Sequence, residues 1–85
     1  MYNIRLLKAL ADETRLEIIT NLLKKELSVL EIVSIVKKSQ PNISIALRKL
    51  EDAGLIVSRK DGKKVIYSIK DRAFIEKILG MISNG

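Results

Sequence analysis

Residues 39–64 read SQPNISIALRKLEDAGLIVSRKDGKK, and this stretch decides the fold. Its first half predicts a helix that opens at Ser39, because four apolar residues recur at the spacing that buries one side of a helix: Ile43, Ala46, Leu47 and Leu50. Pro41 suits the first turn, where a backbone N–H has no helical partner. Gly54 suits the left-handed position that ends a helix. The pattern therefore indicates both ends of this helix and its buried side.

The second half of the stretch predicts a β-hairpin. Residues 55–60 and 63–69 have the composition of strands, and Asp61-Gly62 between them is a strong signal for a tight turn. The hairpin is expected to follow the helix directly.

Four more helices are predicted around this stretch. An apolar helix covers about residues 3–10, and a second one, capped by Asp12, runs to about Lys25. A third, short helix begins at Ser28-Val29-Leu30-Glu31, which has the form of a capping box. Asp71 is expected to cap a last helix.

The predicted order is helix-helix-helix-helix-strand-strand-helix, in a single domain of residues 1–85. Only one or two residues join the third and fourth helices, which is typical of a helix-turn-helix. With a hairpin directly after it, this motif becomes a winged helix, a mainly α fold with a small β-hairpin. In that geometry the helix that opens at Ser39 lies in the major groove of DNA, and the hairpin tip reaches an adjacent groove or the backbone.

Positive charge gathers in the same part of the chain. Residues 37–64 hold eight Lys and Arg against three Asp and Glu, and so carry +5 of the chain's net +6. Charge concentrated in this way is the expected footprint of a protein that binds a polyanion. A basic face that is only solvated remains the alternative.

The composition excludes several kinds of protein. With no Cys and no His, the chain has neither disulfides nor thiolate metal sites, and it lacks the commonest metal ligand and general base. No apolar run is long enough to span a membrane, and the start does not resemble a signal peptide. We therefore expect a cytoplasmic, non-enzymatic protein that needs no cofactor and no membrane.

The exposed side of the helix that opens at Ser39 is expected to read bases. Gln and Asn can form two hydrogen bonds with adenine, and Arg can do the same with guanine. An exposed Ile can pack on a thymine methyl or, alternatively, on neighbouring protein, and the polar residues of the first turn can instead serve as helix caps. The candidates are Gln40, Pro41, Asn42, Ser44, Ile45, Arg48 and Lys49.

Four cations flank the predicted turn of the hairpin: Arg59, Lys60, Lys63 and Lys64. We expect them to neutralise phosphates, with Arg59 or Lys63 as candidates for the minor groove. Such contacts position a protein on DNA without reading its sequence. Lysines on an edge strand also block aggregation, and both roles can hold at once.

Three segments resemble the ArsR/SmtB winged-helix repressors. Residues 7–16, LKALADETRL, resemble their opening motif, and residues 39–50 resemble their recognition helix. Residues 53–56, followed by Arg59, Gly62 and Tyr67, are similar to their wing. The resemblance covers about residues 4–70. It implies a homodimeric repressor that binds a pseudo-palindromic operator in double-stranded DNA.

The resemblance also implies that the dimer pairs through the first and last helices, about residues 3–10 and 71–82. The last helix has an apolar face wider than one short helix can bury on so small a domain, and exposed patches of this kind usually mark an interface. Ordinary core packing is the alternative. The interface candidates are Leu6, Leu10, Phe74, Ile78 and Ile82.

The chain departs from the family pattern at its metal sites. Metal-sensing members carry two cysteines in a Glu-Leu-Cys-Val-Cys-Asp-Leu segment, whereas residues 26–32 here read ELSVLEI. Hydroxyl and aliphatic groups cannot replace thiolates as ligands for soft metals. The family's two recognition-helix histidines are Ile45 and Ala46 here, which predicts a different operator. We therefore expect a regulator that does not respond to metals, with its effector unknown.

Two other functions remain open at this stage. An architectural protein that coats DNA would bind every sequence with a steep dependence on salt. A protein-interaction module would use the same fold to dock a protein partner. Discrimination between operator and random DNA separates the coating protein from a specific regulator, and absence of binding to either DNA would point to protein partners.

Overall fold

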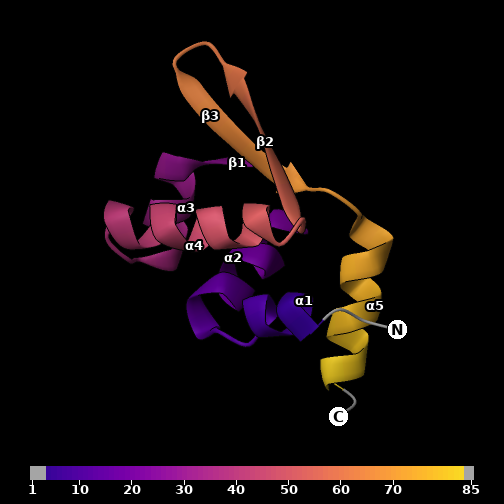
Figure 1. The fold of residues 1–85 in the computed structure, drawn as a ribbon. Helices are drawn as coiled ribbons and strands as arrows, with labels where there is room; N and C mark the ends of the chain where they lie inside the picture. Colours follow the sequence, from indigo (N-terminus) through magenta and orange to yellow (C-terminus); the bar gives the residue numbers. More distant parts are fainter. Residues whose placement is uncertain (1–3, 84–85) are drawn as a thin grey trace.

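The computed structural model describes residues 4–83, without the side chains of positions 5 and 81–83, and it has the predicted winged-helix architecture (Figure 1). The elements are α1 (Ile4–Leu10), α2 (Glu13–Leu22), β1 (Leu27–Ser28), α3 (Val29–Val36), α4 (Gln40–Asp52), β2 (Ile56–Asp61), β3 (Lys64–Ile69) and α5 (Arg72–Ser83). Within the described range, no helix combines the length and the apolar character needed to cross a membrane.

The four predicted helix starts are confirmed by their caps. In each case a side-chain oxygen accepts a hydrogen bond from the backbone N–H three residues further on: Asp12 at 3.0 Å, Ser28 at 3.2 Å, Ser39 at 3.3 Å and Asp71 at 3.1 Å. Glu31 completes the capping box by accepting from the backbone N–H of Ser28 at 2.9 Å. These bonds satisfy donors that a helix start otherwise leaves open.

Three of the capping groups are carboxylates, and two of them, Asp12 and Glu31, lead us to expect that stability depends on acid. The backbone N–H of Arg15 donates to Asp12, and this hydrogen bond is the main cause that holds the pKa of Asp12 below its ordinary value. The backbone N–H of Ser28 lowers the pKa of Glu31 in the same way. A carboxylate with a lowered folded-state pKa contributes stability above its ordinary pKa and loses it as the pH falls through the folded value.

We therefore expect the free energy of unfolding to decline as the pH drops below the ordinary values of 3.8 and 4.5. Urea unfolding between about pH 3 and pH 7 measures the effect. The double variant Asp12→Asn with Glu31→Gln keeps an acceptor oxygen at both positions but cannot titrate. Its unfolding free energy should fall less steeply with acid, and an unchanged slope would exclude these caps as the cause.

The sheet has three antiparallel strands in the order β1-β3-β2. Strand β1, in which Leu27 pairs with Tyr67, was not predicted from the sequence. The turn lies one residue later than predicted, because Asp61 pairs with Lys64 and leaves Gly62 and Lys63 as the loop. Gly62 has φ +65°, and a glycine at the first of two loop residues suits a type II′ turn.

Helix α2 ends at Leu22 rather than at the predicted Lys25. The chain must leave the helix early because Leu27 enters the sheet beside β3. The carbonyl of Leu23, left open by this ending, accepts a hydrogen bond from the Arg72 guanidinium of α5. A long-range contact thus satisfies one of the carbonyls that the end of the helix leaves open.

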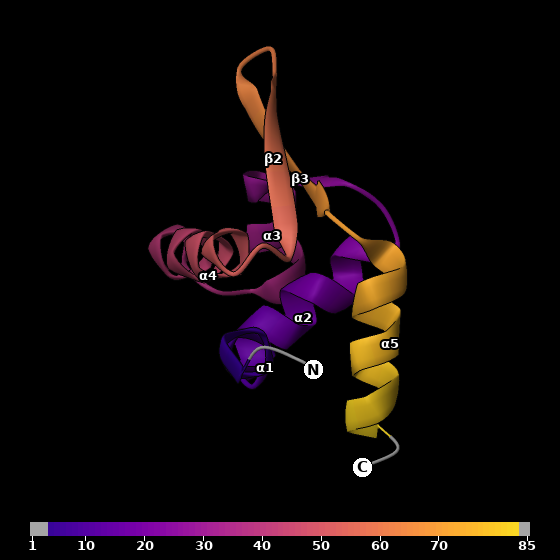
Figure 2. The same cartoon turned by 45° about the vertical axis from the view of Figure 1, so that its right-hand side comes forward.

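The core is aliphatic and lies where α2, α3 and α4 meet the base of the hairpin. The predicted buried stripe of α4 is confirmed: Ile43, Ala46, Leu47 and Leu50 are all buried. Helix α5 adds Ile75 and Ile78 to the same core. The hairpin rises from one end of the molecule, and α5 extends toward the other end beside α1 and α2 (Figures 1 and 2).

Candidate nucleic-acid interface

Helix α4 exposes all seven candidate residues, but on three different sides. The buried stripe fixes the rotation of the helix, and a turn of about 100° per residue places Pro41, Ile45 and Arg48 opposite the core. Ile45 is 56% exposed there, which is unusual for a large aliphatic side chain. The outermost line of α4 therefore combines apolar surface with a cation.

One flank of α4 faces the hairpin. Gln40 lies across a groove of about 400 Å³ from Lys63 and Lys64 of the hairpin. The start of α3 closes the groove, with Leu30 contributing an aliphatic side chain that is 66% exposed. Further along this flank, Ser58 of β2 donates a hydrogen bond to Glu51 at 2.9 Å. The helix and the hairpin therefore form one concave surface.

The other flank of α4 faces the start of α2. Asn42 and Ile45 line a hollow of about 230 Å³ together with Thr14, Arg15 and Lys38. Asn42 therefore lies beside α2, and not on the outermost line of α4 where Arg48 lies. The hollow lies next to the capped start of α2, whose helix dipole favours negative charge.

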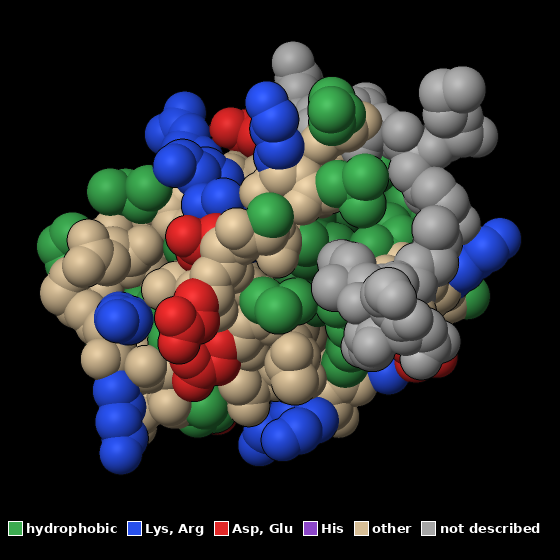
Figure 3. Space-filling model, turned by 90° about the horizontal axis from the view of Figure 1, so that it is seen from below, with side chains coloured by type: hydrophobic (Ala, Val, Ile, Leu, Met, Phe, Trp, Pro, Cys, Tyr) green, Lys and Arg blue, Asp and Glu red, His purple; other side chains and the backbone are tan. Residues whose placement is uncertain are grey.

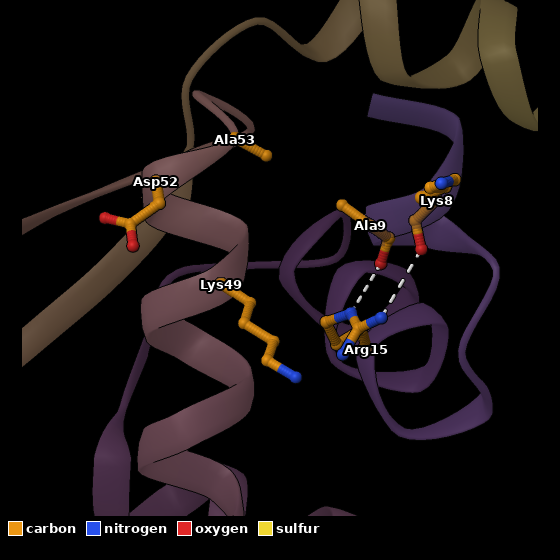
Figure 4. A pocket seen from close by; sticks show the side chains of 6 residues that line it. All are labelled: Lys8, Ala9, Arg15, Lys49, Asp52 and Ala53. Atoms are coloured by element: carbon orange, nitrogen blue, oxygen red, sulfur yellow. Dashed lines mark hydrogen bonds between the residues drawn. The ribbon is translucent and has the colours of Figure 1, made fainter. Parts of the chain in front are cut away.

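Arg15 has a structural role that the sequence analysis did not assign. Its Nε donates to the carbonyl oxygen of Ala9 at 2.7 Å, and its Nη2 donates to that of Lys8 at 3.3 Å (Figure 4). These two bonds satisfy carbonyls at the end of α1, and Asp12 lies 4.0 Å from the same guanidinium. The resemblance to the opening motif of the repressor family was the available signal, since this segment carries both Asp12 and Arg15.

Lys49 extends from α4 toward Arg15 across a pocket of about 380 Å³, whereas the carboxylate of Asp52 points away from it (Figure 4). Lys49 also contributes, as a minor cause, to the lowered pKa of Asp12. This candidate therefore lies on the flank that faces α1 and α2, and the structure does not bring it together with the hairpin cations.

The four hairpin cations are exposed as predicted, but they are not equivalent. Arg59 Nη1 lies 2.9 Å from Glu26 Oε2, and the hydrogen bond to this carboxylate raises the pKa of Arg59. Among the described side chains, Lys60, Lys63 and Lys64 have no ion-pair partner within 4 Å. Three free cations therefore surround the loop, and the fourth is already paired.

The structure changes the set of candidate dimer residues. Leu10 and Ile78 are each 1% exposed in the chain's own core, so the prediction that they face a partner is wrong for these two side chains. Leu6 and Phe74 are half-buried against that core, and the Ile82 side chain lies outside the described part of the chain. The exposed aliphatic residues of α1 are Ile4, 69% exposed, and Leu7, 39% exposed.

The exposed face of α1 continues into an apolar hollow of about 410 Å³ lined by Leu7, Leu10, Ala11 and Leu16. Seen from below, hydrophobic side chains gather on this end of the molecule (Figure 3). The exposed side of α1 is therefore not the side that carries Leu6 and Leu10, and the sequence did not separate the two sides because all four residues, Ile4, Leu6, Leu7 and Leu10, are apolar.

The sequence matches a known protein family and several known regulators. Residues 12–58 match the model of the family described as bacterial regulatory protein, arsR family. Over 67 residues the chain is 42% identical to a probable mercury resistance operon repressor of Streptomyces lividans, covering 79% of this chain and 54% of that protein. Over the same length it is 45% identical to the arsenical resistance operon repressor of Escherichia coli, covering 78% and 57%.

Solved structures show the same fold. Reduced HlyU from Vibrio cholerae superposes with a TM-score of 0.82 at 38% identity, covering 92% of this chain and 85% of that one. A homodimeric winged helix-turn-helix DNA-binding domain from Mycobacterium bovis, described as a possible ArsR-family regulator, gives 0.84 at 28% identity, covering 95% and 77%. The chain spans somewhat over half the length of the two curated repressors that it matches.

Proposed function

The chain belongs to the arsR family of bacterial regulatory proteins, and we propose that it is a homodimeric transcriptional repressor that binds specific double-stranded DNA. The observation that carries the proposal is the concave surface between the hairpin and the flank of α4 that faces it, with Gln40 across the groove from Lys63 and Lys64. The relatives from Streptomyces lividans and Escherichia coli are both named repressors. HlyU of Vibrio cholerae is named a transcriptional activator, so activation is the other sign of regulation to test.

In this proposal α4 enters the major groove and the hairpin follows the backbone. Ile45 and Arg48 lie on the outermost line of α4, where base edges would be closest. Lys60, Lys63 and Lys64 neutralise phosphates beside the groove and fix the register of the protein on the duplex. A dimer would place two such helices in half-sites about one helical turn apart, or a multiple of that.

We propose that the two protomers pair through the exposed face of α1 and through α5. The support is the exposure of Ile4 and Leu7 on one side of α1, which continues past the end of the helix to Ala11 in an apolar hollow. The Mycobacterium bovis domain of the same fold is described as homodimeric. A second copy of the chain that covers this apolar face would remove it from water, and this burial would stabilise the dimer.

We propose that release from DNA, if it is regulated, does not use a thiolate or imidazole metal site. Several relatives are named for resistance to mercury, arsenicals or cadmium. This chain has no Cys and no His, and within residues 4–83 no three Asp and Glu side chains are grouped closely enough to hold a metal ion. Soft metals need ligands that the sequence does not contain.

Fluorescence anisotropy tests the proposed function. The titration compares a duplex from upstream of the protein's own gene with a scrambled duplex, at several salt concentrations. A preference of about 10³ or more at physiological salt would support a specific regulator. Equal binding to both duplexes with a steep salt slope would favour a protein that coats DNA, and no binding to either would favour a protein-docking module.

Ile45→Ala tests whether the outermost line of α4 touches bases. If Ile45 packs on a thymine methyl, the variant should bind the preferred duplex about fivefold more weakly, which is about 1 kcal/mol, and the scrambled duplex as before. Ile35→Ala is the matched control, since it removes an exposed isoleucine from α3. Equal losses on both duplexes would remove Ile45 from the base-reading set.

A further inference from the structure

We propose that Glu26 sets the DNA affinity of the hairpin, because its carboxylate competes with DNA phosphates for the guanidinium of Arg59. The inference rests on the proposed DNA-binding function. The observation behind it is the 2.9 Å ion pair between Glu26 Oε2 and Arg59 Nη1, the one ion pair among the described residues that involves a hairpin cation.

The register of the sheet explains how two residues far apart in sequence meet. Ile66 of β3 pairs with Ser28 of β1 on one side and with Arg59 of β2 on the other. Directly opposed residues share a face of the sheet, and so do residues two positions apart along a strand. Glu26 precedes β1 and lies two positions before Ser28, so an extended chain places it on the face that carries Arg59.

The short strand β1 therefore gives the hairpin an acidic neighbour. Lys60, Lys63 and Lys64 lie beyond Arg59 toward the loop and have no such partner within the described part of the chain. Arg59 is the hairpin cation closest to the body of the domain, and it is the one whose charge is already balanced. The free cations of the hairpin are thus confined to its tip.

This pair is weak enough for a phosphate to replace. Both side chains are about half exposed, at 53% for Arg59 and 52% for Glu26, and exposed ion pairs contribute little to stability. A phosphate that approaches Arg59 must also approach the Glu26 carboxylate, and the two negative charges repel each other. Glu26 therefore lowers affinity for any duplex that the base of the hairpin touches, whatever its sequence.

Glu26→Gln tests the inference in the full chain. The variant should bind both the preferred and the scrambled duplex about two- to fivefold more tightly at physiological salt. Because Arg59 then neutralises one more phosphate, the slope of log K against log salt should steepen by about 0.9. Glu17→Gln is the matched control: it makes the same charge change on the exposed side of α2, and none of the ion pairs between described side chains involves Glu17.

A double-mutant cycle shows whether Glu26 acts through Arg59. In the Arg59→Gln background, Glu26→Gln should tighten binding clearly less than in the wild type, because only the repulsion between Glu26 and phosphate is then relieved, and it should leave the salt slope unchanged. Tightening of the same size in both backgrounds, or the same tightening from Glu17→Gln, would mean that only net charge matters and would overturn the proposal. Weaker binding by Glu26→Gln would also overturn it, since Glu26 would then orient Arg59 toward DNA.

Failure of the proposed DNA-binding function can be distinguished from failure of the proposed role of Glu26. In the first case the wild-type chain would bind neither duplex, and both proposals would fall. If the wild type binds DNA while Glu26→Gln changes neither affinity nor slope, only the role of Glu26 is wrong. A thermal melt of each variant checks that the change has not altered folding, because an exposed ion pair is expected to affect stability little.

Discussion

Replacing Lys63 and Lys64 together by alanine is expected to lower the affinity for DNA about thirtyfold at physiological salt. Each phosphate contact adds about 0.9 to the salt slope, which at about 0.15 M salt corresponds to roughly fivefold in affinity per contact. Both lysines are exposed at the loop of the hairpin, and both line the groove that faces Gln40. Phosphate contacts carry no sequence information, so the loss should be the same for a preferred and a scrambled duplex.

The chain contains a matched control for this variant. Lys24 and Lys25 are also adjacent and exposed, but they lie in the connection between α2 and β1. Replacing them by alanine makes the same change in net charge and should leave the salt slope unchanged. Anisotropy titrations from about 50 to 200 mM salt give both slopes. If the two double variants lose affinity equally, the hairpin has no special place in binding and acts only through net charge.

The parts of the fold that were predictable from sequence depend on neighbours along the chain. The capping box at Ser28, the proline in the first turn of α4 and the left-handed Gly54 are each decided within a few residues. The buried stripe of α4 is equally local, since one helical period specifies it. The order of these local signals was sufficient to predict a winged helix.

Three of the missed features depend on how separate elements of the chain pack together. The strand β1 has two residues, too few for the alternation that marks a strand, and it exists because Tyr67 pairs with Leu27. The pairing of Glu26 with Arg59 follows from that strand. The side of α1 that is buried depends on how α1 packs on α2, and seven residues carry too short a pattern to show it.

Leu7→Asp is expected to separate the proposed dimer into folded monomers. Leu7 is 39% exposed and lines the apolar hollow at the α1 end of the molecule. In a two-fold symmetric dimer the same patch occurs on both protomers, so one substitution buries two unpaired charges. Because burial of an unpaired charge is costly, the dimer dissociation constant should rise by at least about a hundredfold.

Sedimentation at low micromolar concentration measures the change, and Ile35→Asp is the control. Ile35 is an aliphatic residue of α3 with 42% exposure, close to that of Leu7, but it lies outside the proposed interface. A dimer that persists in Leu7→Asp would place the interface elsewhere. A monomeric Leu7→Asp should also lose most of its affinity for a two-half-site operator, because one protomer then contacts one half-site. It should keep the weak, salt-dependent binding to single half-sites that the hairpin lysines provide, which distinguishes a lost interface from a lost fold.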